Sequence, residues 1–148
     1  MRVDSVIAIG ADHHGVVLKK WLQESFLFSQ PLKWLDCGTH GFERVDYPIF
    51  ARKVCDTLIG HRAERGILIC GTGIGMAMVA NRFKGIYAGL VWNAEVARRA
   101  RAEDNVNLLV LPADYLDQQE AQQIVEAWLC TPFNGGRYAQ RISLIDDK

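Results

Sequence analysis

Residues 65–75 read RGILICGTGIG, a short apolar run that ends in a cysteine and passes into a glycine-rich turn. A continuous run of this kind is typical of a strand buried on both faces, as in a parallel sheet. Residues 74–83 follow with a pattern that predicts a helix. A strand, a tight turn and a helix make one βα unit, and repetition of that unit along the chain would decide the fold class.

Apolar runs and helical patterns alternate on both sides of this stretch. Strands are predicted at residues 6–10, 32–38, 65–71, 85–92 and 106–112. Helices are predicted at residues 15–28, 48–60, 74–83, 94–103 and 117–130, with a short terminal helix after the Gly135-Gly136 break. Five consecutive βα units predict a three-layer αβα fold of the α/β class, with a doubly wound parallel sheet of five strands. The common strand order is 2-1-3-4-5, and 148 residues fit a single domain over 1–148.

The composition excludes several classes of function. The chain has 17 basic and 17 acidic residues, so it offers no net charge to attract nucleic acid or an anionic membrane surface. No apolar stretch approaches the roughly 18 residues that span a bilayer, and the N-terminal MRVDSVIAIG reads as a strand rather than a signal peptide. The cysteines are widely scattered, without the spacing of a zinc site: Cys37, Cys55, Cys70 and Cys130. We therefore expect free thiols, no metal site and a cytoplasmic location.

The predicted strand order brings two loops together. Strands 1 and 3 become neighbours, and the chain winds away from them in opposite directions. Ligands bind outside the carboxyl ends of the strands at such a switch point. The loop after strand 1 spans residues 10–15, and the loop after strand 3 spans residues 70–75. We therefore predict that these loops face each other across a ligand site.

The glycines at 71, 73 and 75 do not match the common nucleotide motifs. A dinucleotide fingerprint requires GxGxxG and an acidic residue about 20 residues on, but position 76 is Met and the next strand ends in Trp92-Asn93. The P-loop pattern fails because no Gly-Lys-Ser/Thr follows. What remains is a row of backbone N–H groups suited to an anion or a developing oxyanion, or a tight turn without a ligand.

Cys70 lies at the predicted end of a strand, directly before a helix. The positive end of a helix would lower the pKa of the thiol from its ordinary value near roughly 8.5. Thr72, two residues on, could donate or relay a proton. A redox centre or a peptidase is less favoured than a catalytic thiol, because no second cysteine and no triad stands nearby in the sequence. The alternative is a buried cysteine that acts as a small apolar residue.

Two further pairs admit a functional and a structural interpretation. Asp12 and His13 could bind substrate hydroxyls or a phosphate, or Asp12 could cap the following helix; His14 could take the place of His13. Arg137 and Arg141 are four residues apart and share one face of the predicted terminal helix. Two guanidinium groups on one face could bind a phosphate, or they could simply make that face soluble.

Four stretches together resemble the ribose-5-phosphate isomerase B family, which includes galactose-6-phosphate isomerase subunits and allose-6-phosphate isomerases. They are GADHHG at 10–15, VDYP at 45–48, ILICGTGIGMAMVANRFKGI at 67–86 and GGRYAQR at 135–141. The resemblance runs from about residue 6 to 145. It implies an aldose–ketose isomerase without metal or cofactor, which interconverts ribose 5-phosphate and ribulose 5-phosphate. It also implies a homodimer, or a dimer of dimers, with active sites at the subunit interface.

The resemblance also implies roles for individual residues. Cys70 would be the base that moves a proton between C1 and C2, with Thr72 assisting at the oxygens. Backbone groups that stabilise the enediolate would come from Gly71, Gly73 and Gly75. The sugar would be bound by Asp12 and Tyr47, and the phosphate by His13, Arg137 and Arg141. The pairing of Met76 with Cys70 is that of the cysteine-dependent branch of the family.

Four positions after residue 100 depart from the family pattern. Glu103 stands where the family has the His that opens the sugar ring, and Asp104 replaces an Asn that contacts substrate. Asp114 aligns with a phosphate-binding Arg, and Tyr138 with a His. Glu103 could act as the acid or base if burial raised its pKa. Alternatively, the chain isomerises a six-carbon sugar phosphate, or is a sugar-phosphate-binding homologue with impaired catalysis.

Overall fold

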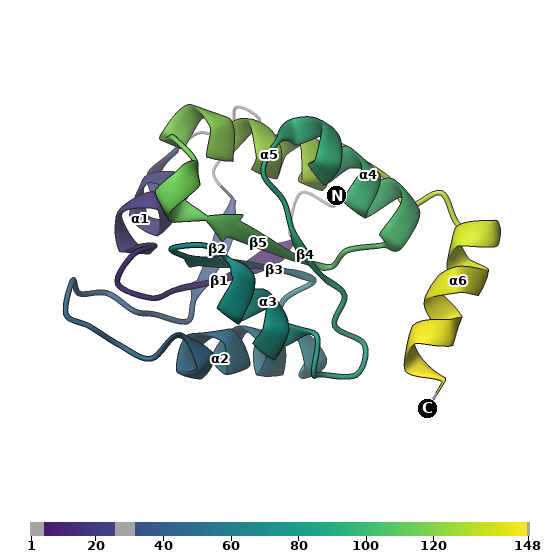
Figure 1. The fold of residues 1–148 in the computed structure, drawn as a ribbon, viewed down its shortest axis with the longest axis horizontal. Helices are drawn as coiled ribbons and strands as arrows, with labels where there is room; N and C mark the ends of the chain where they lie inside the picture. Colours follow the sequence, from purple (N-terminus) through teal and green to yellow (C-terminus); the bar gives the residue numbers. More distant parts are fainter. Residues whose placement is uncertain (1–4, 26–31, 148) are drawn as a thin grey trace.

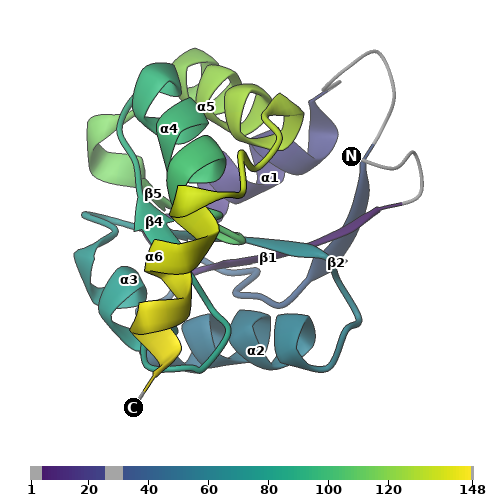
Figure 2. The ribbon, with the colours of Figure 1, turned by 90° about the vertical axis from the view of Figure 1, so that its right-hand side faces the viewer.

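The computed structural model describes residues 5–25 and 32–147. Within them, the parallel sheet comprises β1 (Val6–Ala11), β2 (Lys33–Asp36), β3 (Arg65–Cys70), β4 (Ala88–Leu90) and β5 (Leu108–Pro112). The helices are α1 (Val16–Glu24), α2 (Tyr47–Ile59), α3 (Ile74–Ala80), α4 (Ala94–Asp104), α5 (Gln118–Cys130) and α6 (Arg137–Asp146), with a 3-10 turn η1 (Ala113–Tyr115). Helices α1, α4 and α5 cover one face of the sheet, and α2 and α3 cover the other (Figures 1 and 2). The predicted three-layer α/β fold is confirmed.

The elements lie where the sequence predicts them, with most ends shifted by a few residues. The largest difference is β4, since the strand predicted at 85–92 shortens to Ala88–Leu90. Two interpretations fall partly outside the described residues. They are the first helix, predicted at residues 15–28, and the strand-like N-terminus, which included residues 1–4.

The order of the last two strands was predicted wrongly. The sheet runs β2-β1-β3-β5-β4, not 2-1-3-4-5. The reason is burial: every residue of β5 is buried, whereas all three residues of β4 are only partly buried. A fully apolar strand belongs in the sheet interior, and a short strand can stay at the edge. The switch point between β1 and β3 is as predicted, but the end of β5 now lies beside the end of β3, with Pro112 opposite Cys70.

Helix α2 packs close to the sheet because glycines on two neighbouring strands leave it room. A Cβ atom on Gly10 or on Gly66 would lie 2.8 Å from a methyl carbon of Val54 in α2. Val54 is fully buried in the apolar core on this face. This packing fixes the start of α2 and therefore the position of Tyr47, its first residue.

The core on the opposite face is built around Trp128 of α5. The indole N–H of Trp128 donates to the carbonyl of Val106 at 2.9 Å. The guanidinium of Arg65 lies over the indole ring and donates to the carbonyls of Trp128 and Leu129. Burial, with the charge of Arg101, lowers the pKa of Arg65 to about 10.

In the described part of the chain, no helix has the length and apolar character needed to cross a membrane.

Candidate active site

Cys70 is the last residue of β3 and lies at the carboxyl edge of the sheet. It is 5% exposed and packs in the core beneath α2 and α3. The amide of Asp12 donates to the carbonyl of Ile69 at 3.1 Å, which ties the loop after β1 to the residue before Cys70. The two loops therefore meet at the switch point, as the sequence predicts.

The turn after Cys70 wraps backbone amides around its sulfur. Gly73 has φ of +76° and caps α3, and a Cβ atom there would collide with the side chain of Leu90. Burial raises the pKa of the Cys70 thiol, against hydrogen bonds from the amides of Met76 and Gly73 that lower it. The prediction that the following helix would give a lowered pKa is wrong, because desolvation outweighs these amides. Thr72 lies beside them, and its hydroxyl accepts from the amide of Ile74 at 3.3 Å.

Asp12 is buried and comes directly after β1, at the start of the loop that leads to α1. Its Oδ1 accepts from the amides of His14 at 2.9 Å and Gly15 at 3.3 Å, so the carboxylate holds the turn that leads into α1. Its negative charge also contributes to the raised pKa of Cys70. The N-cap of α1 is Gly15, without a side-chain cap, so Asp12 holds the turn before the helix and does not cap it. The same carboxylate lies close to the thiol. His13, partly buried, accepts the amide of Val45 on Nδ1 at 3.3 Å.

Tyr47 brings α2 into the same site. A Cβ atom on Gly75 would lie 2.6 and 2.7 Å from two ring carbons of Tyr47 and 2.9 Å from its hydroxyl, so the phenol lies directly on the backbone that starts α3. Tyr47 is 37% exposed, which leaves part of the ring free to meet a ligand. Only a glycine at position 75 permits this contact.

His14 and Asp114 form a pair that the sequence did not predict. His14 Nδ1 lies 3.1 Å from Asp114 Oδ1, and the Asp114 amide donates to the carbonyl of Gly71 at 3.0 Å. This contact could have been predicted from the sequence only with the correct strand order. With β4 wrongly placed beside β3, η1 and Asp114 were expected one strand further from Cys70.

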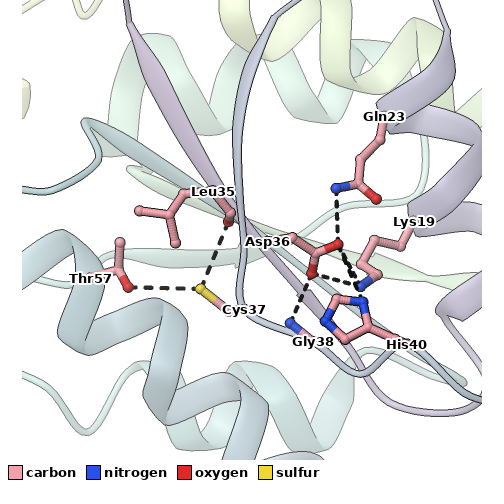
Figure 3. Close-up of polar contacts among 8 residues, drawn as sticks. All are labelled: Lys19, Gln23, Leu35, Asp36, Cys37, Gly38, His40 and Thr57. Carbon is pink, nitrogen blue, oxygen red and sulfur yellow. Dashed lines mark hydrogen bonds and ion pairs between the residues drawn. The ribbon is translucent and has the colours of Figure 1, made fainter.

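A buried ion pair anchors the loop that carries Val45. Lys19 in α1 donates to both oxygens of Asp36 at 2.7 and 2.9 Å, and Asp36 also accepts from Gln23 and from the amide of Gly38 (Figure 3). Burial alone would raise the pKa of the Asp36 carboxyl, but these donors together hold it below its ordinary value. The carbonyl of Gly38 accepts a hydrogen bond from the amide of Ala11 at 2.7 Å, and Ala11 directly precedes Asp12.

The remaining predicted residues lie elsewhere in the chain: Glu103, Asp104, Arg137 and Arg141. Helix α4 runs back from the carboxyl end of β4, so its last turn lies at the amino edge of the sheet. Helix α6 lies beside that turn, at the end of the molecule away from the loops of Cys70 and Asp12 (Figures 1 and 2). Glu103 pairs there with Arg99 at 3.2 Å. One copy of the chain therefore does not unite these residues with Cys70.

The same end of the molecule carries stacked cations. The guanidinium groups of Arg137 and Arg141 lie 5.0 and 5.8 Å from the centre of the Tyr138 ring. The two arginines share one helix face, as their spacing predicts. Across residues 5–25 and 32–147, no group of three or more His, Cys, Asp or Glu side chains is arranged to hold a metal ion.

This geometry accords with the proteins to which the chain is similar. Residues 7–145 match the family model described as Ribose/Galactose Isomerase. A relative from Rickettsia conorii, provisionally named a sugar phosphate isomerase with no sugar specified, is 42% identical over 94% of this chain and 96% of its own length.

Two solved structures extend the similarity to the fold. Ribose 5-phosphate isomerase from Thermotoga maritima matches with a TM-score of 0.93 and 42% identity, covering 97% of this chain and 99% of that one. Ribose-5-phosphate isomerase B from Mycoplasma genitalium, solved with bound ribulose-5-phosphate, matches with a TM-score of 0.89 and 39% identity, covering 95% and 93%. The chain therefore belongs to the ribose/galactose isomerase family and is a sugar-phosphate isomerase.

Proposed function

We propose that the chain interconverts ribose 5-phosphate and ribulose 5-phosphate through an enediolate, with Cys70 as the base. The observation that carries this proposal is the buried thiol at the switch point, with the amides of Met76 and Gly73 against its sulfur. The Mycoplasma genitalium relative with its bound ribulose-5-phosphate supports the choice of sugar.

The proposed step moves one proton between C2 and C1 and one between their oxygens, and it leaves the carbon skeleton intact. The Cys70 thiolate takes the proton from C2 of the open-chain aldose, and the C–H electrons form the C1–C2 double bond as the carbonyl oxygen becomes an oxyanion. A proton then passes from the hydroxyl on C2 to the O1 oxyanion, the electrons left on O2 form the C2 carbonyl, and the thiol returns a proton to C1, which gives the ketose. A carbon acid this weak requires stabilisation of the oxyanion, which we assign to the backbone of Gly71, Gly73 and Gly75, with Thr72 assisting at the oxygens.

The sugar and its phosphate require further contacts. We assign the sugar hydroxyls to Asp12 and Tyr47, which lie on either side of the Cys70 loop. The phosphate would be bound by His13 together with Arg137 and Arg141. Since the two arginines lie far from Cys70 in one chain, they would reach the site from a second copy.

A homodimer is therefore part of the proposal, which also places the protein in the cytoplasm. The second copy would also supply Glu103 and Asp104 to the sugar end of the site. Exposed apolar side chains in α3, after β4 and at the end of α6 support such an interface: Ile74, Met78, Trp92, Leu144 and Ile145. Side chains of this size at 56 to 70% exposure are typical of a contact surface.

A six-carbon sugar phosphate is the second candidate substrate. The carboxylate of Asp114 beside the Cys70 loop favours it, because the negative charge makes this part of the site a poor place for a phosphate. A longer substrate would carry its phosphate further from Cys70.

The test is an isomerase assay on ribose, allose and galactose phosphates at equal protein concentration. The proposal predicts the highest kcat/KM for ribose 5-phosphate. A higher value for allose or galactose 6-phosphate would identify a six-carbon sugar phosphate as the substrate. Calorimetric binding of these sugars without turnover of any of them would instead indicate a catalytically impaired homologue.

A further inference from the structure

We propose that His14 and Asp114 form an acid–base pair that opens the sugar ring before Cys70 acts, with His14 as the catalytic residue and Asp114 as its positioning residue. This inference rests on the proposed function, because only an aldose that is presented as a closed ring requires such a step. It assigns ring opening to two residues of the same chain as Cys70.

The first observation is the geometry of the pair. His14 Nδ1 lies 3.1 Å from Asp114 Oδ1, within hydrogen-bond reach. A carboxylate on Nδ1 favours the tautomer that carries the proton there, which leaves the lone pair of Nε2 free as a base. Imidazole held by a carboxylate in this way is a common device for moving protons to and from oxygen.

The second observation is the place of the pair beside the thiol. Both side chains lie against Gly71, the residue after Cys70: a Cβ atom there would lie 2.7 Å from Asp114 Oδ2 and 3.3 Å from His14 Nδ1. The backbone fixes both partners, since His14 N–H donates to Asp12 and Asp114 N–H donates to Gly71. A sugar bound with C2 at Cys70 therefore meets this pair.

The third observation is accessibility. The side chains of His14 and Asp114 are 49% and 47% exposed, so the imidazole can meet a ligand without any rearrangement. The neighbouring His13 has no carboxylate on its Nδ1, because that nitrogen accepts a hydrogen bond from the amide of Val45. His14 thus has a ring nitrogen held by a carboxylate and a side chain that is half exposed at this edge.

The chemical step is balanced without any additional reactant. The proton of the C1 hydroxyl passes to His14 Nε2, and the O–H electron pair forms the C1 carbonyl. The bond between C1 and the ring oxygen breaks, with its electron pair moving to the ring oxygen. That oxygen takes the proton back from Nε2, so His14 ends neutral and the sugar becomes an open-chain aldehyde.

The test compares the two directions of the reaction in a His14→Asn variant. Asparagine keeps a donor near the position of Nδ1 for Asp114 and removes Nε2. Ribulose 5-phosphate has no free hydroxyl that could close a furanose ring, so its consumption needs no ring opening. We expect kcat/KM on ribose 5-phosphate to fall by roughly 10²-fold or more, while kcat for ribulose 5-phosphate stays within threefold of the unmodified chain.

Asp114→Asn should show the same asymmetry with a smaller loss, and Asp114→Glu should restore part of it. His61→Asn is the matched control, because His61 is an exposed histidine after α2 and should change neither direction. Equal losses in both directions, or none in His14→Asn, would overturn the inference while the proposed function stands. Absence of turnover on either pentose phosphate by the unmodified chain would overturn both.

Discussion

Replacing Lys19 by Met should destabilise the fold far more than the same change at the neighbouring lysine. The side chain of Lys19 is 3% exposed, and its ammonium donates to both oxygens of Asp36. Removing one partner of a buried ion pair costs about 3–5 kcal/mol, because the other charge is left uncompensated. Asp36 is 25% exposed and keeps its donors from Gln23 and Gly38, so we place the loss lower, at about 2–3 kcal/mol.

Lys20→Met is the matched control. Its ammonium lies 4.0 Å from Glu24, and both side chains are largely exposed, so the loss should stay below about 0.5 kcal/mol. Urea unfolding at pH 7 measures both losses, and the loss at Lys19 corresponds to a Tm lower by roughly 4–12 °C. Adding Asp36→Asn to Lys19→Met should recover part of the loss, because no buried charge then remains.

The pH dependence supplies a second readout of the same pair. Since the folded-state pKa of Asp36 lies below its unfolded value, this carboxylate contributes stability above a pH of roughly 4. The contribution is lost as the pH falls through the folded-state pKa. The difference between the unmodified chain and Lys19→Met should therefore shrink in acid. Equal stabilities of Lys19→Met and Lys20→Met at pH 7 would refute the reasoning.

Three further predictions concern the loop of Cys70. Gly73→Ala should lower stability by about 2 kcal/mol or more, measured by urea unfolding, since the positive φ and the contact with Leu90 both oppose a Cβ atom; an unchanged midpoint would contradict this. Gly75→Ala should displace the Tyr47 ring and raise KM for ribose 5-phosphate several-fold with the fold retained; an unaltered KM would show that the ring does not bind the sugar. Because burial raises the pKa of Cys70 and the thiolate is the base, kcat/KM should rise with pH across the neutral range and beyond; a profile that falls with pH there would exclude the thiolate.

The fold could be predicted from the sequence because the apolar residues form short continuous runs in the strands and recur every three to four residues in the helices. The apolar run 65–70 and the glycines after it defined one βα unit, and the same pattern recurred on both sides. The order of β4 and β5 could not be predicted from periodicity, because it depends on which strand is covered on both faces. The fully apolar LLVLP at 108–112 is typical of a strand covered on both faces, whereas 2-1-3-4-5 is only a common order for five strands.

The site could be predicted where residues follow one another in sequence, as in the loop from Cys70 to Gly75. The contact between His14 and Asp114 could not, because it joins residues 100 positions apart and depends on the strand order. The sign of the Cys70 pKa shift also required the structure, since desolvation and amide hydrogen bonds act in opposite directions.

The central claim is that the Cys70 thiolate moves the proton, and a single substitution tests it. Turnover of ribose 5-phosphate by Cys70→Ala should be abolished, with circular dichroism and the urea midpoint showing that the fold is retained. Cys130→Ala is the matched control and should keep full activity, because Cys130 is an exposed thiol at the end of α5. Turnover by Cys70→Ala at the rate of the unmodified chain would contradict the account.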